Sequence, residues 1–149
     1  MSDREFTIVR VFDAPRELVF QAWVDPDQLT EWAGPQGFSA PRDRIVVEPR
    51  VGGRYDAVLV SDADGSSYPT AGVFREIVAP ERLVFTWSDP TGKESVTPES
   101  VVTVTFAETH DGKTSVSLHL LAPGPLSAED GAEDGWAQSL DRLAALLRL

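Results

Sequence analysis

Hydrophobic and polar residues alternate along most of the chain, and this period of two is typical of half-buried β-strands. A first strand is predicted at residues 6–12, which are rich in apolar and β-branched side chains. Further strands are predicted at residues 45–48, 54–60, 71–78, 83–87, 101–107 and 114–121. Turn-forming residues such as Gly52-Gly53 and Asp111-Gly112 separate them. Connections this short require antiparallel neighbours, because a parallel crossover needs about a dozen residues or more.

Two short helices are predicted directly after the first strand. Asp13 and Pro15 indicate a helix start, with a cap-like residue followed by a proline at the first helical position. Four residues of this helix are expected to share its apolar face: Leu18, Val19, Ala22 and Trp23. A second helix is expected to begin at Asp25, whose side chain caps it, and to turn Leu29 and Trp32 inward.

A longer helix is predicted at the C-terminal end of the chain. Ser127 offers a cap, and acidic residues follow it in the first turn. Apolar side chains then recur at steps of four, three and four residues: Trp136, Leu140, Leu143 and Leu147. The order of strand, two helices, six strands and long helix predicts a single α+β domain over residues 1–149, with the helices on one side of the sheet.

Many residues of this pattern match a known family. They are Phe12-Asp13-Ala14-Pro15-Arg16-Glu17-Leu18-Val19-Phe20, Ala22-Trp23, Asp25-Pro26, Leu29, Trp32, Gly34-Pro35, Gly52-Gly53-Arg54-Tyr55, Gly72-Val73-Phe74-Arg75-Glu76-Ile77, Pro80-Glu81-Arg82-Leu83-Val84-Phe85-Thr86-Trp87 and Gly135-Trp136. With them the chain resembles the START-like superfamily of polyketide cyclases, dehydrases and lipid-transport proteins, and within it the homologues of the activator of the heat-shock-protein-90 ATPase. The resemblance implies a helix-grip fold, in which a curved antiparallel sheet of six or seven strands surrounds the long C-terminal helix and leaves an apolar cavity.

The composition of the chain argues against several classes of partner and of site. The net charge is -11, and no basic cluster is available for counterion release, which argues against a nucleic-acid partner. There is no cysteine, so disulfides, thiol nucleophiles and cysteine-ligated metals are excluded. No apolar run approaches the roughly 20 residues that a membrane span needs. We therefore expect a cytoplasmic protein with no membrane insertion, no metal and no cofactor.

The sequence offers one weak catalytic candidate, Glu76. It lies two residues after Phe74 in a predicted strand, and on the concave face of the sheet its carboxylate would act as a general base or orient a polar ligand. The alternative, which we favour, is an ion pair with a neighbour such as Arg54 or Arg75.

Large aromatic rings are more informative than the carboxylates. Core packing accounts for any single ring, whereas rings from both the sheet and the long helix line a cavity in a helix-grip fold. The expected ligand-binding residues are Trp32, Phe38, Tyr55, Phe74, Trp87, Trp136 and Leu140. We expect Trp32 and Phe38 near the cavity mouth, and the polar segment of residues 88–100 as a gate.

Three functions remain open at this point. The favoured one is a binding protein for a small hydrophobic molecule, held between the sheet and the C-terminal helix. The second is a cyclase-type or hydratase-type enzyme for a polyketide-like or aromatic substrate, in which Glu76 or Tyr55 moves a proton. The third is a stress-related or co-chaperone-like interaction module, which would need an exposed apolar patch. Homodimerisation is left open.

Overall fold

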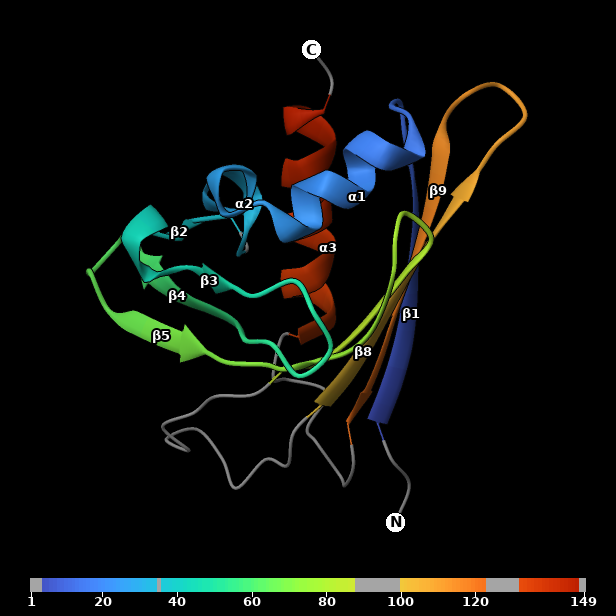
Figure 1. The fold of residues 1–149 in the computed structure, drawn as a ribbon. Coiled ribbons are helices and arrows are strands. Elements are labelled where there is room, and N and C mark those ends of the chain that lie inside the picture. The colour runs from blue at the N-terminus through green and yellow to red at the C-terminus, as the bar shows by residue number, and fades with distance from the viewer. Residues whose placement is uncertain (1–3, 35, 88–99, 123–131, 148–149) are drawn as a thin grey trace.

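The computed structural model describes residues 4–34, 36–87, 100–122 and 132–147, and it has a mixed α+β fold (Figure 1). In chain order the elements are β1 (Arg4–Phe12), α1 (Arg16–Val24), α2 (Pro26–Trp32), β2 (Phe38–Ser39), the 3-10 helix η1 (Arg42–Arg44), β3 (Val46–Val47), β4 (Tyr55–Ser61), β5 (Ser67–Thr70), β6 (Phe74–Val78), β7 (Arg82–Trp87), β8 (Ser100–Glu108), β9 (Thr114–Ala122) and α3 (Ala132–Leu146). This order confirms the predicted succession of elements. β2 and β5 are strands that the hydrophobic pattern missed.

The strands pair antiparallel in two groups. A five-stranded sheet has the order β1-β9-β8-β7-β6, and β4 pairs with β2, β3 and β5. Helix α3 lies across the five-stranded sheet, with α1 and α2 beside it (Figure 1). This arrangement confirms the predicted antiparallel sheet around a C-terminal helix.

The two longest hairpin strands show why the period of two was informative. Val102, Val104 and Phe106 of β8 are buried, and so are their neighbours at every second position of β9: Val116, Leu118 and Leu120. The residues between them are less buried. Because successive side chains of a strand point to opposite faces, one face of this hairpin forms the core beneath α3.

The two groups of strands meet at Gly72. The Tyr55 N–H donates to the Gly72 carbonyl at 2.9 Å, and the Thr86 N–H donates to the Val73 carbonyl at 3.0 Å. A Cβ atom at Gly72 would lie 2.0 Å from the Thr86 carbonyl oxygen, so only glycine fits this approach. The strand predicted at residues 71–78 therefore begins later, at Phe74.

The helices after β1 differ from the prediction in two details. Pro15 is the N-cap residue of α1 and not its first helical residue, and no side chain caps this helix. Leu18 is 56% exposed, whereas Phe20 is buried against Phe106 of β8, with 5.3 Å between the ring centroids. Because α1 packs on β8 through Phe20, its buried stripe is rotated away from Leu18. The predicted cap of α2 is confirmed, since the Asp25 carboxylate accepts from an N–H in its first turn.

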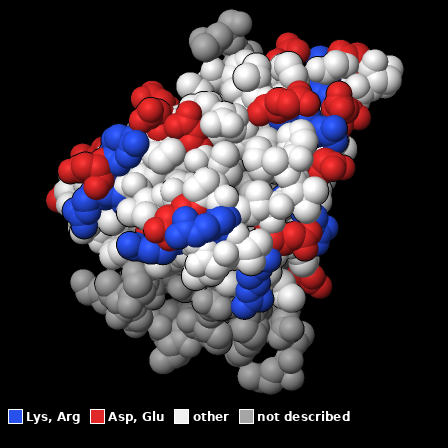
Figure 2. Space-filling view, in the orientation of Figure 1, with Lys and Arg blue, Asp and Glu red and all other residues white. Residues whose placement is uncertain are grey.

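Charged side chains of both signs are interspersed on the surface seen in Figure 2. Ion pairs join Arg42 to Asp27 at 2.6 Å and Arg54 to Asp56 at 2.6 Å. Exposed pairs of this kind contribute little to stability, about 0–1 kcal/mol each. Among the helices that the structure describes, none is long and apolar enough to cross a membrane.

The side chain of Arg142 joins α3 to the C-terminal end of α2. Its Nη1 donates to the carbonyl oxygens of Ala33 at 3.2 Å, Gly34 at 2.9 Å and Phe38 at 3.1 Å. Its Nη2 donates to the carbonyl oxygen of Glu31 at 3.3 Å. The last carbonyls of a helix have no partner within the helix, so the guanidinium provides a donor for that of Glu31 and also binds three carbonyls of the chain that follows α2.

We expect Arg142→Leu to lower the free energy of unfolding by about 2–4 kcal/mol, because it removes several charge-assisted hydrogen bonds and leaves carbonyls unpaired. Urea denaturation measures this loss. The matched control is Arg50→Ala, which breaks only a 3.8 Å pair with Glu48 at a side chain that is 70% exposed. It should cost less than about 0.5 kcal/mol. Equal losses in the two variants would contradict the role given to Arg142.

Candidate functional site

Aromatic side chains from the helices and from the strands meet between the sheet and α3. We call this group the aromatic cluster, and its members are Trp23, Trp32, Tyr55, Phe74, Phe85, Trp87 and Trp136. Trp23 of α1 is at its centre. Its ring lies 4.8 Å from that of Trp32, measured between centroids, and 6.5 Å from that of Phe85. It also stacks on Trp136 of α3, with centroids 6.2 Å apart and 15° between the planes.

The cluster extends from Trp23 in two directions. Along the sheet, Phe85 contacts Tyr55 at 4.8 Å and Tyr55 contacts Phe74 at 4.7 Å. In the other direction, Trp136 of α3 contacts Trp87 of β7 edge to face, with 5.6 Å between the ring centroids. Trp87 and Trp136 are partly exposed, whereas Phe74, Phe85 and Trp23 are fully buried. The cluster therefore runs from an accessible end at Trp87 and Trp136 into the core.

Local structure explains why these rings meet. Phe85 and Trp87 are two residues apart in β7, so they point to the same face of the sheet. Trp136 and Leu140 are four residues apart in α3 and lie on one side of the helix. Leu140 is fully buried in the core beside the cluster.

Two polar atoms of the cluster have backbone partners. The Tyr55 hydroxyl donates to the Trp23 carbonyl at 2.5 Å, and Trp32 Nε1 donates to the Ala22 carbonyl at 3.0 Å. Burial raises the pKa of the Tyr55 phenol well above its usual value, because the phenolate would be desolvated. Tyr55 is therefore a neutral donor that ties β4 to α1.

Two indole nitrogens of the cluster are different. Trp23 Nε1 and Trp136 Nε1 are buried, and neither has a hydrogen-bond partner among the residues that the structure describes. More than about nine in ten buried polar groups in high-resolution structures do have a partner. An unpaired donor in a cluster of this kind therefore requires an explanation.

Most of the predicted ligand-binding residues are brought together. Trp32, Tyr55, Phe74, Trp87 and Trp136 belong to the cluster, and Leu140 adjoins it, as set out above. Phe38 does not belong to it: its ring contacts Tyr68 of β5 at 5.8 Å. The prediction omitted Trp23 and Phe85, although both belong to apolar faces that the periodicity had indicated. The predicted gate at residues 88–100 lies outside the described residues except for Ser100.

Glu76 lies at the surface of β6. Its carboxylate pairs with Arg82 Nε at 2.7 Å, and its side chain is 47% exposed. The register of β6 against β7 shifts between Phe74 and Glu76, so the expected common face of these two residues is wrong. The favoured alternative was an ion pair of Glu76 with a neighbouring arginine. Glu76 does form an ion pair, but its partner is Arg82, and Arg54 pairs with Asp56 instead.

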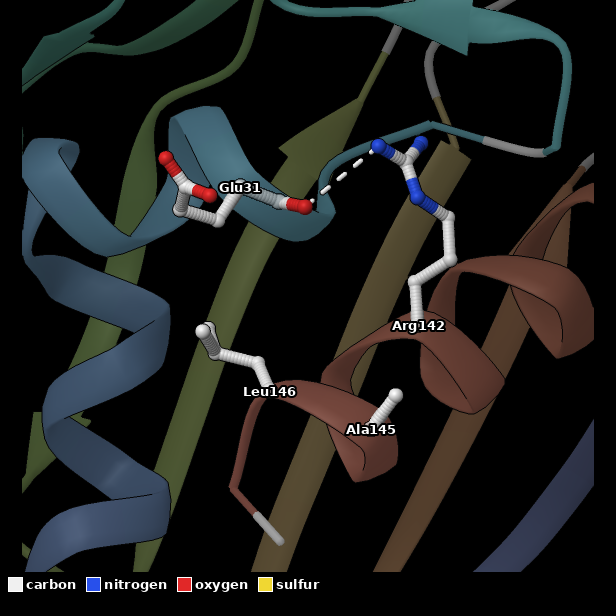
Figure 3. A pocket seen from close by; sticks show the side chains of 4 residues that line it. All are labelled: Glu31, Arg142, Ala145 and Leu146. Carbon is white, nitrogen blue, oxygen red and sulfur yellow. Dashed lines mark hydrogen bonds between the residues drawn. The ribbon is translucent and has the colours of Figure 1, made fainter. Parts of the chain in front are cut away.

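A second feature is an open groove between α2 and α3, with a volume of about 420 Å³ (Figure 3). It is lined by Glu31, Arg142, Ala145 and Leu146. The Glu31 carboxylate points away from Arg142, whose guanidinium is bonded to backbone carbonyls instead (Figure 3). None of these residues belongs to the aromatic cluster. Within the described part of the chain, no group of three or more His, Asp or Glu side chains is arranged to hold a metal ion.

We expect the stability of the protein to fall as pH rises above about 10, the usual pKa of tyrosine. There the unfolded chain loses a phenolic proton that folded Tyr55 retains, so the slope reaches about 1.4 kcal/mol per pH unit from this group. Tyr55→Phe should remove this component, which urea denaturation between about pH 8 and 11 measures. Tyr68→Phe is the control, since Tyr68 is 43% exposed. A wild-type curve that runs parallel to that of Tyr55→Phe would contradict the burial of the phenol.

Comparisons with known proteins identify the family and the fold of the chain. The family model described as Activator of Hsp90 ATPase homolog 1-like protein matches residues 13–148. No curated protein matches the chain significantly. The crystal structure of a protein from Chromobacterium violaceum is similar to this chain. The two sequences are 29% identical, the match covers 97% of each chain, and the TM-score is 0.85.

Two further solved structures are similar over nearly the whole chain. The AHSA1 protein from Silicibacter pomeroyi is 26% identical, with 97% of each chain covered and a TM-score of 0.78. A solution structure from Arthrobacter aurescens is also 26% identical, covers 98% of this chain and 90% of its own, and has a TM-score of 0.81. The chain, which has their START-like fold, therefore belongs to the family of activator of Hsp90 ATPase homolog 1-like proteins.

Proposed function

We propose that the protein binds a small hydrophobic molecule between its sheet and α3, against the aromatic cluster. The observation that carries this proposal is the continuous line of rings from the accessible pair Trp87 and Trp136 to the buried Trp23. Ligand sites in proteins are mostly apolar and aromatic, with a small number of polar groups that fix orientation. The cluster has this composition.

The position of the accessible end also supports binding. Trp136 is stacked on Trp23 and meets Trp87 edge to face, so it joins the helix to the sheet at the point where the rings become partly exposed. A ligand that reaches this point exchanges water for the faces of large rings, each of which buries about 150–250 Å². The gain from apolar contact is about 25 cal/mol for each Å² removed from water.

No observation on the described residues favours the enzymatic alternative. Tyr55 already donates to the Trp23 carbonyl, and Glu76 pairs with Arg82 at the sheet surface. A proton-transfer role would need a carboxyl group with a perturbed pKa inside the cluster. The third function, a protein-interaction role, is the one to which the family name refers. The native mass spectrometry described next bears on it, because a wild-type protein without a bound small molecule would favour it.

We expect the wild-type protein, purified from expressing cells and measured by native mass spectrometry, to carry a small molecule that denaturation releases. Trp136→Ala should lose this adduct, because it removes the ring that connects α3 to the sheet. The variant should also unfold about 2–4 kcal/mol more easily, as a partly buried tryptophan is removed. Leu18→Ala is the matched control, since Leu18 is 56% exposed on α1, and it should keep the adduct.

Two results would overturn the proposal. One is a folded Trp136→Ala protein that keeps the same adduct. The other is a wild-type protein that carries no adduct and takes up neither dodecanoic acid nor 9-fluorenone when these are added.

A further inference from the structure

The indole nitrogens of the aromatic cluster differ in whether they have a hydrogen-bond acceptor. Trp32 Nε1 donates to the Ala22 carbonyl at 3.0 Å, so the fold provides an acceptor for that ring. Trp23 Nε1 and Trp136 Nε1 have none among the described residues, although both atoms are buried and the Trp23 residue is 0% exposed. A buried donor without a partner costs about 1–3 kcal/mol.

The two unpaired donors belong to one stacked pair of rings. Their centroids are 6.2 Å apart and their planes are 15° from parallel, so a molecule that lies against one ring is also close to the other. Two carbonyls at the end of α1 accept from other members of the cluster: that of Trp23 accepts from Tyr55, and that of Ala22 accepts from Trp32. An acceptor for these donors therefore has to come from outside the described residues.

We propose that the ligand is an apolar molecule with an uncharged carbonyl-type oxygen, which accepts from the unpaired N–H of Trp136 or Trp23. The inference rests on the proposed function, because it specifies the ligand of that same site. No Lys, Arg or His is buried among the described residues, so a buried carboxylate would have no cationic partner there and would be strongly disfavoured. A ketone, quinone or ester oxygen accepts a hydrogen bond without that cost.

Two other acceptors compete with this assignment. Trp136 meets Trp87 edge to face at 61°, and Trp23 meets Trp32 at 67°, so an N–H could be directed at a neighbouring ring. Such N–H to ring contacts are weaker than N–H to carbonyl bonds. A buried water would need two to four polar partners, and the stacked pair offers only donors. A ligand oxygen satisfies the donors and keeps the apolar contact.

The test uses two compounds that share one three-ring frame, 9-fluorenone and fluorene, in which a carbonyl replaces a methylene group. Dissociation constants are measured by equilibrium dialysis. We expect fluorenone to bind at least tenfold more tightly than fluorene to the wild-type protein. In ¹H–¹⁵N spectra, the indole N–H proton signal of Trp136 or Trp23 should move downfield with fluorenone, as a new hydrogen bond requires, and should not move downfield with fluorene, which changes it only through ring currents.

The variant Trp136→Phe keeps a ring on α3 but removes the N–H. Where the shifted signal is that of Trp136, this variant should bind fluorene and fluorenone with nearly equal affinity; where it is that of Trp23, the variant should keep their ratio. Trp87→Phe should weaken both and preserve their ratio in either case. Trp23→Phe is avoided because Trp23 contacts rings of α2, the sheet and α3. The indole spectra of the wild-type protein report on Trp23 instead.

The outcomes separate this inference from the proposed function. If both compounds bind equally and no indole N–H signal moves downfield with fluorenone, the carbonyl assignment is overturned while the binding function stands, and ring contacts account for the N–H groups. If neither compound binds, the carbonyl assignment fails, and the proposed function is contradicted as well only where the wild-type protein carries no adduct and takes up no dodecanoic acid.

Discussion

The packing of Trp23 determines how the helices are placed on the sheet. Its ring contacts Trp32 of α2, Phe85 of β7, Phe106 of β8 and Trp136 of α3. Its backbone carbonyl also accepts the Tyr55 hydroxyl of β4. Since protein interiors are packed as densely as organic crystals, a change in the size or tilt of this one ring has to be taken up by elements on every side of it.

The same packing determines which buried polar groups of the cluster form hydrogen bonds. The end of α1 presents two carbonyls to the cluster, and these take the hydroxyl of Tyr55 and the indole of Trp32. Both donors thereby hold α1 against β4 and α2. The indole N–H groups of the stacked pair Trp23 and Trp136, by contrast, have no acceptor among the described residues.

Much of the fold was predictable because long alternating segments leave little choice of structure. The strands predicted at residues 101–107 and 114–121 agree with β8 and β9, whose buried face is regular. β5 was missed because it contains Pro69, which argues against a strand, and β2 because it has only two residues. The bulge that separates Phe74 from Glu76 has no signature in the pattern of hydrophobic residues.

The candidate site was predictable as a set of rings but not as a set of hydrogen bonds. The resemblance to a helix-grip fold implied that Trp32, Tyr55 and Trp136 would meet, and all three belong to one hydrophobic core or pack against it. Which indole finds a carbonyl depends on ångström-scale distances between elements far apart in the chain. Only the folded arrangement shows that Trp32 has an acceptor, whereas Trp136 has none in the described part of the chain.

The contacts of Arg142 have a consequence for how this chain tolerates divergence. Its guanidinium recognises the carbonyl oxygens of residues 31, 33, 34 and 38, and every amino acid presents that same oxygen. The side chains at positions 31, 33 and 38 can therefore be exchanged without breaking the link between α2 and α3. The arginine itself has no equivalent, since no other side chain offers a planar fork of five N–H donors. The joint thus concentrates its sequence requirement in Arg142 and in Gly34, whose positive φ favours glycine, and leaves the side chain of residue 31 at the rim of the neighbouring groove free to change.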